Sequence, residues 1–257
     1  MGKKYLIANW KMQLSINESR SLAQELVERL ALIKTDTSIV VCPSGPVLSQ
    51  VAGVIRGSDL LLGAQNSFWE DRGAYTGEVS PANLKELGCS FCLVGHSERR
   101  EYLGETDEMV GRKVAALLTQ DITPIICIGE TEDERDDGRR EEVLVQQLSL
   151  ALADAFRQPH NGQHFIVAYE PIWMIGSGQM IESEDVIASA QLIRKTLNEL
   201  CTAAVADKFC TVIYGGSVDT INLSGFLSCS GIDGALVGGT SLTADNFMSL
   251  VEIASRS

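Results

Sequence analysis

The chain has 257 residues, is rich in core-forming side chains and is strongly acidic. Hydrophobic residues make up 45% of it and charged residues 21%, and 34 acidic against 21 basic residues give a formal net charge of −13 at pH 7. This composition excludes a disordered, collagen-like or coiled-coil chain. The negative charge repels a polyanion, so that no nucleic acid is expected as a partner.

No stretch of the sequence approaches the roughly 18 apolar residues that span a bilayer, and the first residues show no pattern of an export signal. Seven cysteines are scattered inside apolar runs, which is typical of reduced thiols that pack as small hydrophobic side chains. We therefore expect a cytoplasmic protein with no membrane partner and no disulfide framework.

Eight short, continuously apolar runs alternate with longer amphipathic segments along the chain. Continuous apolar runs are typical of parallel strands that are buried on both faces. The predicted strands are 5–9, 38–42, 60–64, 91–94, 124–128, 165–169, 211–214 and 235–237. Ser80, Thr106 and Ser183 mark helix starts between them, and the acidic run 130–137 is interpreted for the most part as the solvated start of a helix.

Eight strands, each followed by a helix, predict an α/β protein with a closed (β/α)8 barrel. A doubly wound open sheet has fewer strands and a Gly-rich turn after its first strand, where this chain has Asn9-Trp10-Lys11. No low-complexity segment or long linker divides the sequence. We therefore expect one barrel domain over residues 1–257.

In such a barrel the chemistry lies at the carboxyl ends of the strands, where His96 and Glu170 are found. Backbone amides of the turn that begins at Ser97 can donate to one ring nitrogen of His96, which leaves a neutral imidazole able to act as an electrophile. Glu170 follows an apolar strand, and a carboxylate held among apolar residues suits a general base. An arginine partner for Glu170 is the alternative.

Gly-rich turns follow three of the last strands: Gly176-Ser177-Gly178, Gly215-Gly216-Ser217 and Gly238-Gly239. Such turns expose backbone N–H groups that cradle a phosphate, especially after strands seven and eight of a barrel. A phosphate bound by so acidic a protein needs a local cation, which Lys11 can supply. The alternative for Lys11 is a solvated surface lysine.

Eight motifs, taken in chain order, carry a resemblance to a known family. They are Asn9-Trp10-Lys11-Met12, Gly63-Ala64-Gln65-Asn66, Gly73-Ala74-Tyr75-Thr76-Gly77-Glu78, Val94-Gly95-His96-Ser97-Glu98-Arg99-Arg100, Cys127-Ile128-Gly129-Glu130, Ala168-Tyr169-Glu170-Pro171, Tyr214-Gly215-Gly216-Ser217-Val218 and Leu236-Val237-Gly238-Gly239. In this order they are highly specific. The chain resembles the triosephosphate isomerases over essentially its whole length, which implies a TIM barrel.

The resemblance implies Glu170 as the base, His96 as the electrophile and Lys11 as the cation at the substrate, with Glu98 pairing with Lys11. The substrate-binding residues that it implies are Asn9, Lys11, Gly176, Ser217, Gly238 and Gly239. The implied reaction interconverts dihydroxyacetone phosphate and D-glyceraldehyde 3-phosphate through an enediol(ate), as in glycolysis and gluconeogenesis, with no metal or organic cofactor.

Two further expectations concern the loops. Residues 171–181 have the Gly-rich middle of a lid, and we expect Ile181 to stiffen its hinge; the alternative is that Ile181 packs against the following helix. The connector 65–79 is far longer than an ordinary strand-to-helix loop. The resemblance implies that it enters a neighbouring subunit near Lys11 and Leu14, forming a homodimer.

Two other functions remain open at this level. Another phosphosugar barrel enzyme, such as a phosphoribosyl isomerase, shares the phosphate loops but generally lacks the set of Lys11, His96 and Glu170. A barrel kept only for protein interaction would tolerate the loss of Glu170, which is present here. An assay of D-glyceraldehyde 3-phosphate isomerisation distinguishes all three.

Overall fold

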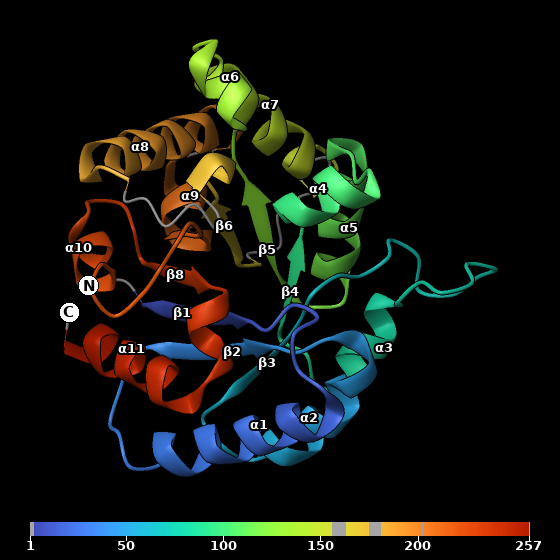
Figure 1. Ribbon diagram of the computed structural model, residues 1–257. Coiled ribbons are helices and arrows are strands. Elements are labelled where there is room, and N and C mark those ends of the chain that lie inside the picture. The colour runs from blue at the N-terminus through green and yellow to red at the C-terminus, as the bar shows by residue number, and fades with distance from the viewer. Residues whose placement is uncertain (1–2, 156–162, 175–180, 202, 257) are drawn as a thin grey trace.

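Eight parallel strands close into a barrel in the order of the sequence, and helices surround it (Figure 1). The computed structural model describes residues 3–155, 163–174, 181–201 and 203–256. The strands are β1 (Tyr5–Asn9), β2 (Ser38–Cys42), β3 (Leu61–Ala64), β4 (Phe91–Val94), β5 (Thr123–Ile128), β6 (Phe165–Tyr169), β7 (Cys210–Tyr214) and β8 (Gly234–Val237). The predicted (β/α)8 barrel is confirmed, and no predicted strand end is wrong by more than one residue.

The helices follow the strands around the outside of the barrel. They are α1 (Ile16–Leu30), η1 (Gly45–Val47), α2 (Leu48–Ile55), α3 (Pro81–Glu86), α4 (Ser97–Leu103), α5 (Asp107–Thr119), α6 (Glu132–Asp136), α7 (Arg140–Ala153), η3 (Ile172–Met174), α8 (Ser183–Leu200), α9 (Ala203–Phe209), α10 (Leu223–Ser228), η4 (Gly239–Leu242) and α11 (Ala244–Arg256). Within the described residues, none of these helices is long and apolar enough to cross a membrane.

Two of the three predicted helix starts are confirmed by their capping bonds. The hydroxyl of Ser80 accepts from the backbone N–H of Asn83, and that of Thr106 accepts from Met109, both at 3.3 Å. Helix α8 instead begins at Ser183 itself, with Glu182 as the N-cap and no capping bond from its side chain. The sequence pattern placed a start signal one residue away from the real cap.

The barrel strands bury residues on both faces, which explains their continuous apolar sequence. Successive side chains of a strand point to opposite faces. In β1, Ile7 belongs to the cluster that fills the barrel interior, whereas Leu6 and Ala8 belong to the larger cluster that packs against the helices. Since neither face meets water, no alternation of polar residues remains in the sequence.

The connector between β3 and α3 projects from the barrel surface as an extended loop (Figure 1). A backbone hydrogen bond of 2.7 Å from Phe68 to Val79 closes its base. The rings of Phe68 and Tyr75 lie 4.6 Å apart, but residues 71–79 are exposed. The tip of this loop therefore has no hydrophobic core of its own within one chain.

Candidate active site

The carboxyl ends of the strands meet around one cavity of about 280 Å³. The residues that line it are Asn9, Lys11, His96, Glu170, Gly215, Gly216, Ser217, Val218, Leu236, Gly238, Gly239 and Thr240. The structure thus brings together all the predicted site residues except Gly176, which lies outside the described residues.

His96 lies two residues after the end of β4 and is the N-cap of α4. Its ring is largely buried. Its Nδ1 atom accepts a hydrogen bond of 3.3 Å from the backbone N–H of Glu98. An acceptor nitrogen carries a lone pair, so that in the neutral ring the proton sits on Nε2. Nε2 lies 3.4 Å from Oε1 of Glu170. The turn therefore fixes the orientation of the ring, with Nδ1 toward the Glu98 amide and Nε2 toward Glu170.

Glu170 follows the last residue of β6 and is buried. Its Oε2 accepts a hydrogen bond of 3.1 Å from the backbone N–H of Ser97. Gly215 makes room for it, because a Cβ there would lie 2.9 Å from Cγ of Glu170. Among the described residues, Nε2 of His96 faces Glu170, and no arginine pairs with this carboxylate. The alternative of an arginine partner is not supported.

Lys11 is held on several sides and is not a freely solvated lysine. Its backbone has φ of 51°, its N–H donates to Oδ1 of Asn9 at 3.0 Å and its carbonyl accepts from Gln65 at 2.8 Å. The ammonium pairs with Oε1 of Glu98 at 2.5 Å, and the side chain is 25% exposed. A Cβ at Gly238 would lie 4.0 Å from Nζ. The lysine thus reaches across the cavity mouth toward the loop after β8.

Hydrogen bonds brace the two loops after β7 and β8. Asn222 donates to the carbonyl of Ser217 at 3.1 Å, and the hydroxyl of Thr240 donates to the carbonyl of Val218 at 2.7 Å. Gly239 begins the short helix η4, and the first amides of a helix have no partner inside it. This end of the cavity has the backbone chemistry that suits an anion.

Glu130 is not part of a solvated helix start, as the acidic run suggested. It is fully buried, and its Oε1 accepts from the hydroxyl of Tyr169 at 3.1 Å and from the indole N–H of Trp173 at 2.9 Å. Helix α6 begins later, at Glu132, with Thr131 in a capping box. The sequence did not predict the burial of this carboxylate, because its partners lie some 40 positions away.

The predicted lid is described only at its two ends, since residues 175–180 lie outside the described residues. The first end forms η3. At the other, Ile181 is 7% exposed and belongs to the same buried cluster as Val186 of α8. This burial favours the alternative in which Ile181 packs against the following helix.

A second groove, of about 490 Å³, adjoins the cavity at Asn9, Lys11 and His96. It runs beneath the start of the connector, and Met12 at its edge is 93% exposed, together with the exposed Tyr102. Part of the lining of this groove is therefore both apolar and exposed.

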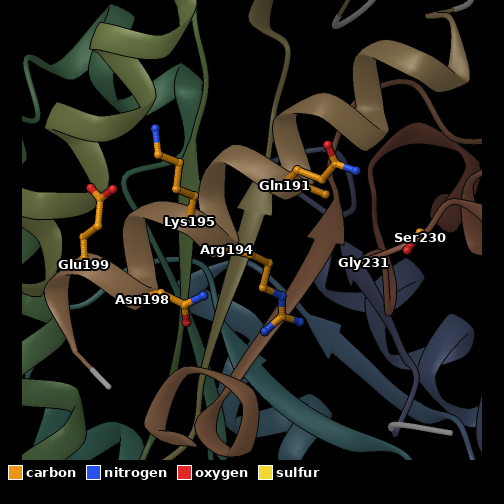
Figure 2. Close-up of a pocket in the computed structure, with 8 residues that line it drawn as sticks. Gln191, Arg194, Lys195, Asn198, Glu199, Ser230 and Gly231 are labelled. Atoms are coloured by element: carbon orange, nitrogen blue, oxygen red, sulfur yellow. The ribbon is translucent and has the colours of Figure 1, made fainter. Parts of the chain in front are cut away.

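Another hollow, of about 560 Å³, lies elsewhere, along α8 and the turn before β8 (Figure 2). Arg194 there already donates to the carbonyl of Cys210 at 3.0 Å and to Asp233 at 3.2 Å. Figure 2 shows Arg194 and Lys195 pointing in opposite directions. Their charges do not converge on a common ligand, in contrast to the cavity at the barrel mouth.

Among the described residues, no group of three or more His, Cys, Asp or Glu could hold a metal ion.

Comparisons with known proteins agree with this geometry. Residues 4–254 match the family model described as triosephosphate isomerase. The triosephosphate isomerase of Roseiflexus sp. (strain RS-1) is 43% identical over 251 residues, which cover 98% of this chain and 97% of that protein. That of Caldanaerobacter subterraneus subsp. tengcongensis is 42% identical, with 98% and 99% covered.

A solved structure gives the same result in three dimensions. The crystal structure of triosephosphate isomerase from Bartonella henselae superposes with a TM-score of 0.86 at 31% identity, covering 98% of this chain and 99% of that one. Fold and sequence thus agree over nearly the full length. The chain belongs to the triosephosphate isomerase family and is an isomerase with the TIM-barrel fold.

Proposed function

We propose that the cavity at the barrel mouth interconverts dihydroxyacetone phosphate and D-glyceraldehyde 3-phosphate, with Glu170 as the base, His96 as the electrophile and Lys11 as the substrate-contacting cation. The observation that carries this proposal is the 3.4 Å separation of His96 Nε2 and Glu170 Oε1 inside a cavity that Lys11 also lines. A base and a proton donor that face each other can serve adjacent carbon and oxygen atoms of one small substrate.

In the proposed reaction the Glu170 carboxylate removes the proton from C1 of dihydroxyacetone phosphate, and the electron pair moves toward the carbonyl oxygen at C2. The Nε2–H of His96 donates to that oxygen as it becomes negative, and the Lys11 ammonium stabilises the same charge. Glu170 then returns a proton to C2 of the enediol(ate), while the proton of the C1 hydroxyl passes by way of His96 to the oxygen at C2, so that C1 becomes the aldehyde carbon. This is an intramolecular proton transfer and uses no metal or organic cofactor.

Glu98 has a supporting role in this proposal. Its backbone N–H fixes the tautomer of His96, and its carboxylate holds the Lys11 ammonium at 2.5 Å. Glu98 therefore orients both the His96 ring and the Lys11 ammonium, which stabilise the developing oxyanion in this proposal. Such preorganised donors cost no reorganisation when the charge develops.

The phosphate of the substrate is assigned to the opposite end of the cavity. Ser217, Gly238 and Gly239 line it there, and they follow the two strands whose loops hold phosphate in many barrels. Asn9 and Gly176 complete the proposed substrate-binding set. In a chain of net charge −13, these amides and the nearby ammonium supply the local attraction for a dianion.

The active assembly proposed is a homodimer in which the connector 65–79 of one subunit enters the second groove of the other. Two observations support this assembly: the connector projects from the barrel with an exposed tip, and the groove beside the catalytic residues has an exposed apolar edge at Met12. We further propose a single domain over residues 1–257 and a cytoplasmic location, which suits a glycolytic family and seven cysteines without a disulfide among the described residues.

A coupled assay tests the proposed function. Purified protein should convert D-glyceraldehyde 3-phosphate into dihydroxyacetone phosphate. A coupled reductase then reduces this product, and the oxidation of NADH measures the rate. Activity on a phosphoribosyl substrate in place of the triose would support the rival barrel enzyme. A folded protein that turns over neither substrate would support the interaction-only barrel and contradict the proposal.

A further inference from the structure

A buried ion pair lies beneath the active-site turn, outside the cavity. The Nζ atom of Lys113 on α5 lies 3.0 Å from Oε2 of Glu105, and the two side chains are only 4% and 2% exposed. Charged side chains are almost never buried to this extent unless they are paired and hydrogen-bonded. Neither residue lines the cavity, so that their burial needs a different explanation from substrate contact.

Glu105 holds the turn that carries the proposed electrophile. Its Oε1 accepts a hydrogen bond of 2.9 Å from the backbone N–H of Gly95, directly before His96. Its Oε2 accepts from Nε of Arg99, three residues after His96. One carboxylate thus binds the chain on both sides of the histidine.

The Gly95 backbone has little freedom to move elsewhere. It lies in the left-handed region with φ of +70°, where a side chain is disfavoured. A Cβ at this position would also lie 3.0 Å from Val110 and 3.1 Å from the carbonyl of Cys127. The hydrogen bond from Gly95 to Glu105 therefore sets the approach of the chain to His96 in a confined space.

Lys113 connects this turn to the base of the connector. Its ammonium donates to Oδ1 of Asn66 at 2.8 Å as well as to Glu105. The preceding residue, Gln65, donates to the carbonyl of Lys11 at 2.8 Å. The first two residues of the connector are thus tied to the substrate-contacting lysine on one side and to the buried ion pair on the other.

The electrostatics of the pair depend on the lysine. Burial raises the pKa of Glu105, but the neighbouring Lys113 and Arg99 more than offset this and hold its pKa below the usual range. Without the ammonium, Arg99 would be the one remaining cationic partner of the Glu105 carboxylate among the described residues, and the compensation would be incomplete. A buried carboxylate with incomplete compensation moves toward water or becomes protonated. Either response alters the contact with Gly95.

We propose that Lys113 is a positioning residue, which acts through Glu105 to set the His96 turn and through Asn66 to hold the start of the connector. This inference rests on the proposed function of His96. It assigns to one buried ammonium the alignment of two segments that are separated by about 30 residues of sequence. Catalysis and the placement of the connector then depend on the same side chain.

Lys113→Met tests the proposal, with Lys85→Met as the matched control. Lys85 is exposed on α3 and donates to the carbonyl of Asp121 at 3.0 Å, away from the cavity. We expect Lys113→Met to lower kcat about tenfold or more, in the range of a misplaced catalytic group, with KM within about threefold of the wild type. The control should keep both constants. The ¹⁵N resonances of the His96 ring should shift in Lys113→Met and stay in place in the control.

A double-variant cycle distinguishes positioning from a general loss of stability. Glu105→Gln is combined with Lys113→Met, and all proteins are assayed above the concentration at which light scattering shows the wild-type mass. If Lys113 acts through Glu105, the double variant loses no more kcat than the more damaged single variant. This cycle also applies if Lys113→Met alone folds poorly, because the double variant removes both buried charges.

Three results would overturn the inference. They are a wild-type kcat in folded Lys113→Met, full recovery of kcat on raising the protein concentration, and multiplicative effects of the two substitutions. An inactive wild type would instead refute the proposed function, and the His96 resonances would still report whether Lys113 positions the turn.

Discussion

His96 and Glu170, which lie 74 positions apart in the sequence, face each other across the barrel mouth with Nε2 and Oε1 separated by 3.4 Å. The same turn supplies a further constraint, because the backbone N–H of Ser97 donates to Oε2 of Glu170 at 3.1 Å. One short segment after β4 therefore binds Oε2 of the carboxylate and faces Oε1, which has no hydrogen-bond partner among the described residues. A small displacement of either group changes both contacts together.

Shortening the base should be costly for this reason. Glu170→Asp retracts the carboxylate by roughly 1 Å, and a misplacement of that size costs about a hundredfold in rate. We expect kcat to fall by at least that factor while KM stays within about threefold. Steady-state kinetics in the coupled assay measure the loss, with Glu132→Asp on α6 as a matched control. A near-native kcat in Glu170→Asp would remove the carboxylate from its proposed role.

The charge of Lys11 should be required, and not only its volume. Lys11→Met keeps a linear side chain but removes the ammonium that contacts Glu98. Losing one preorganised group that stabilises an oxyanion costs about 3 to 4 kcal/mol, or roughly a hundredfold to a thousandfold in kcat/KM. Added ammonium salts should restore part of the activity. Lys34→Met, an exposed counterpart, should behave as wild type, and equal activity of the two variants would refute the assignment.

A charge in the second groove should prevent assembly. Light scattering of the wild type should give twice the 27.8 kDa of one chain. Met12→Glu places a carboxylate at the apolar edge of the groove, and we expect it to shift the mass toward one chain and to lower the activity. Leu32→Glu is the matched control, because Leu32 is 86% exposed but does not line the groove. A fully active monomeric wild type would contradict the proposed dimer.

Stability should fall in mild acid because of a histidine at the opposite end of the barrel. Burial lowers the pKa of His164 from 6.5, and Lys3 lowers it further; the ring also lies against Thr211 and Tyr5. The unfolded chain then binds this proton more readily, so that the free energy of unfolding declines as the pH falls below 6.5.

Urea unfolding at pH 7.5 and pH 5.5 measures this effect. His164→Gln removes the titrating group, and its free energy of unfolding should decline less between the two pH values than that of the wild type. At pH 7.5 the ring is neutral in both states, and titration contributes nothing there. Equal declines in the two proteins would show that other groups cause the acid sensitivity.

The fold was predictable from the sequence because a strand that is buried on both faces is visible as a short apolar run. The strands of the closed barrel are mostly apolar, and the helix starts at Ser80 and Thr106 carry their own capping hydroxyl groups. Helix α8 begins at Ser183, as the sequence predicted, but its N-cap is Glu182, so that Ser183 resembles a cap without acting as one. Local chemistry thus identified the elements, and only their exact ends required the structure.

The candidate site was predictable in part, for a different reason. Polar residues after apolar strands identified His96 and Glu170, since all strand ends of a barrel meet at one mouth. Glu105 and Lys113 gave no such signal, and Glu130, although it follows a predicted strand, lies in an acidic run that is typical of a solvated helix start. Their burial depends on partners from distant segments, and a charged residue in an amphipathic sequence looks solvated until those partners are known.

The positive φ of Lys11 means that stability and turnover make opposite demands on this position. For residues other than glycine, a left-handed backbone costs about 1 to 2 kcal/mol, whereas glycine adopts it freely but carries no ammonium. A library selected only for thermal resistance would therefore favour the loss of this lysine. Engineering a more robust form of the enzyme requires that each round of selection also measure isomerisation.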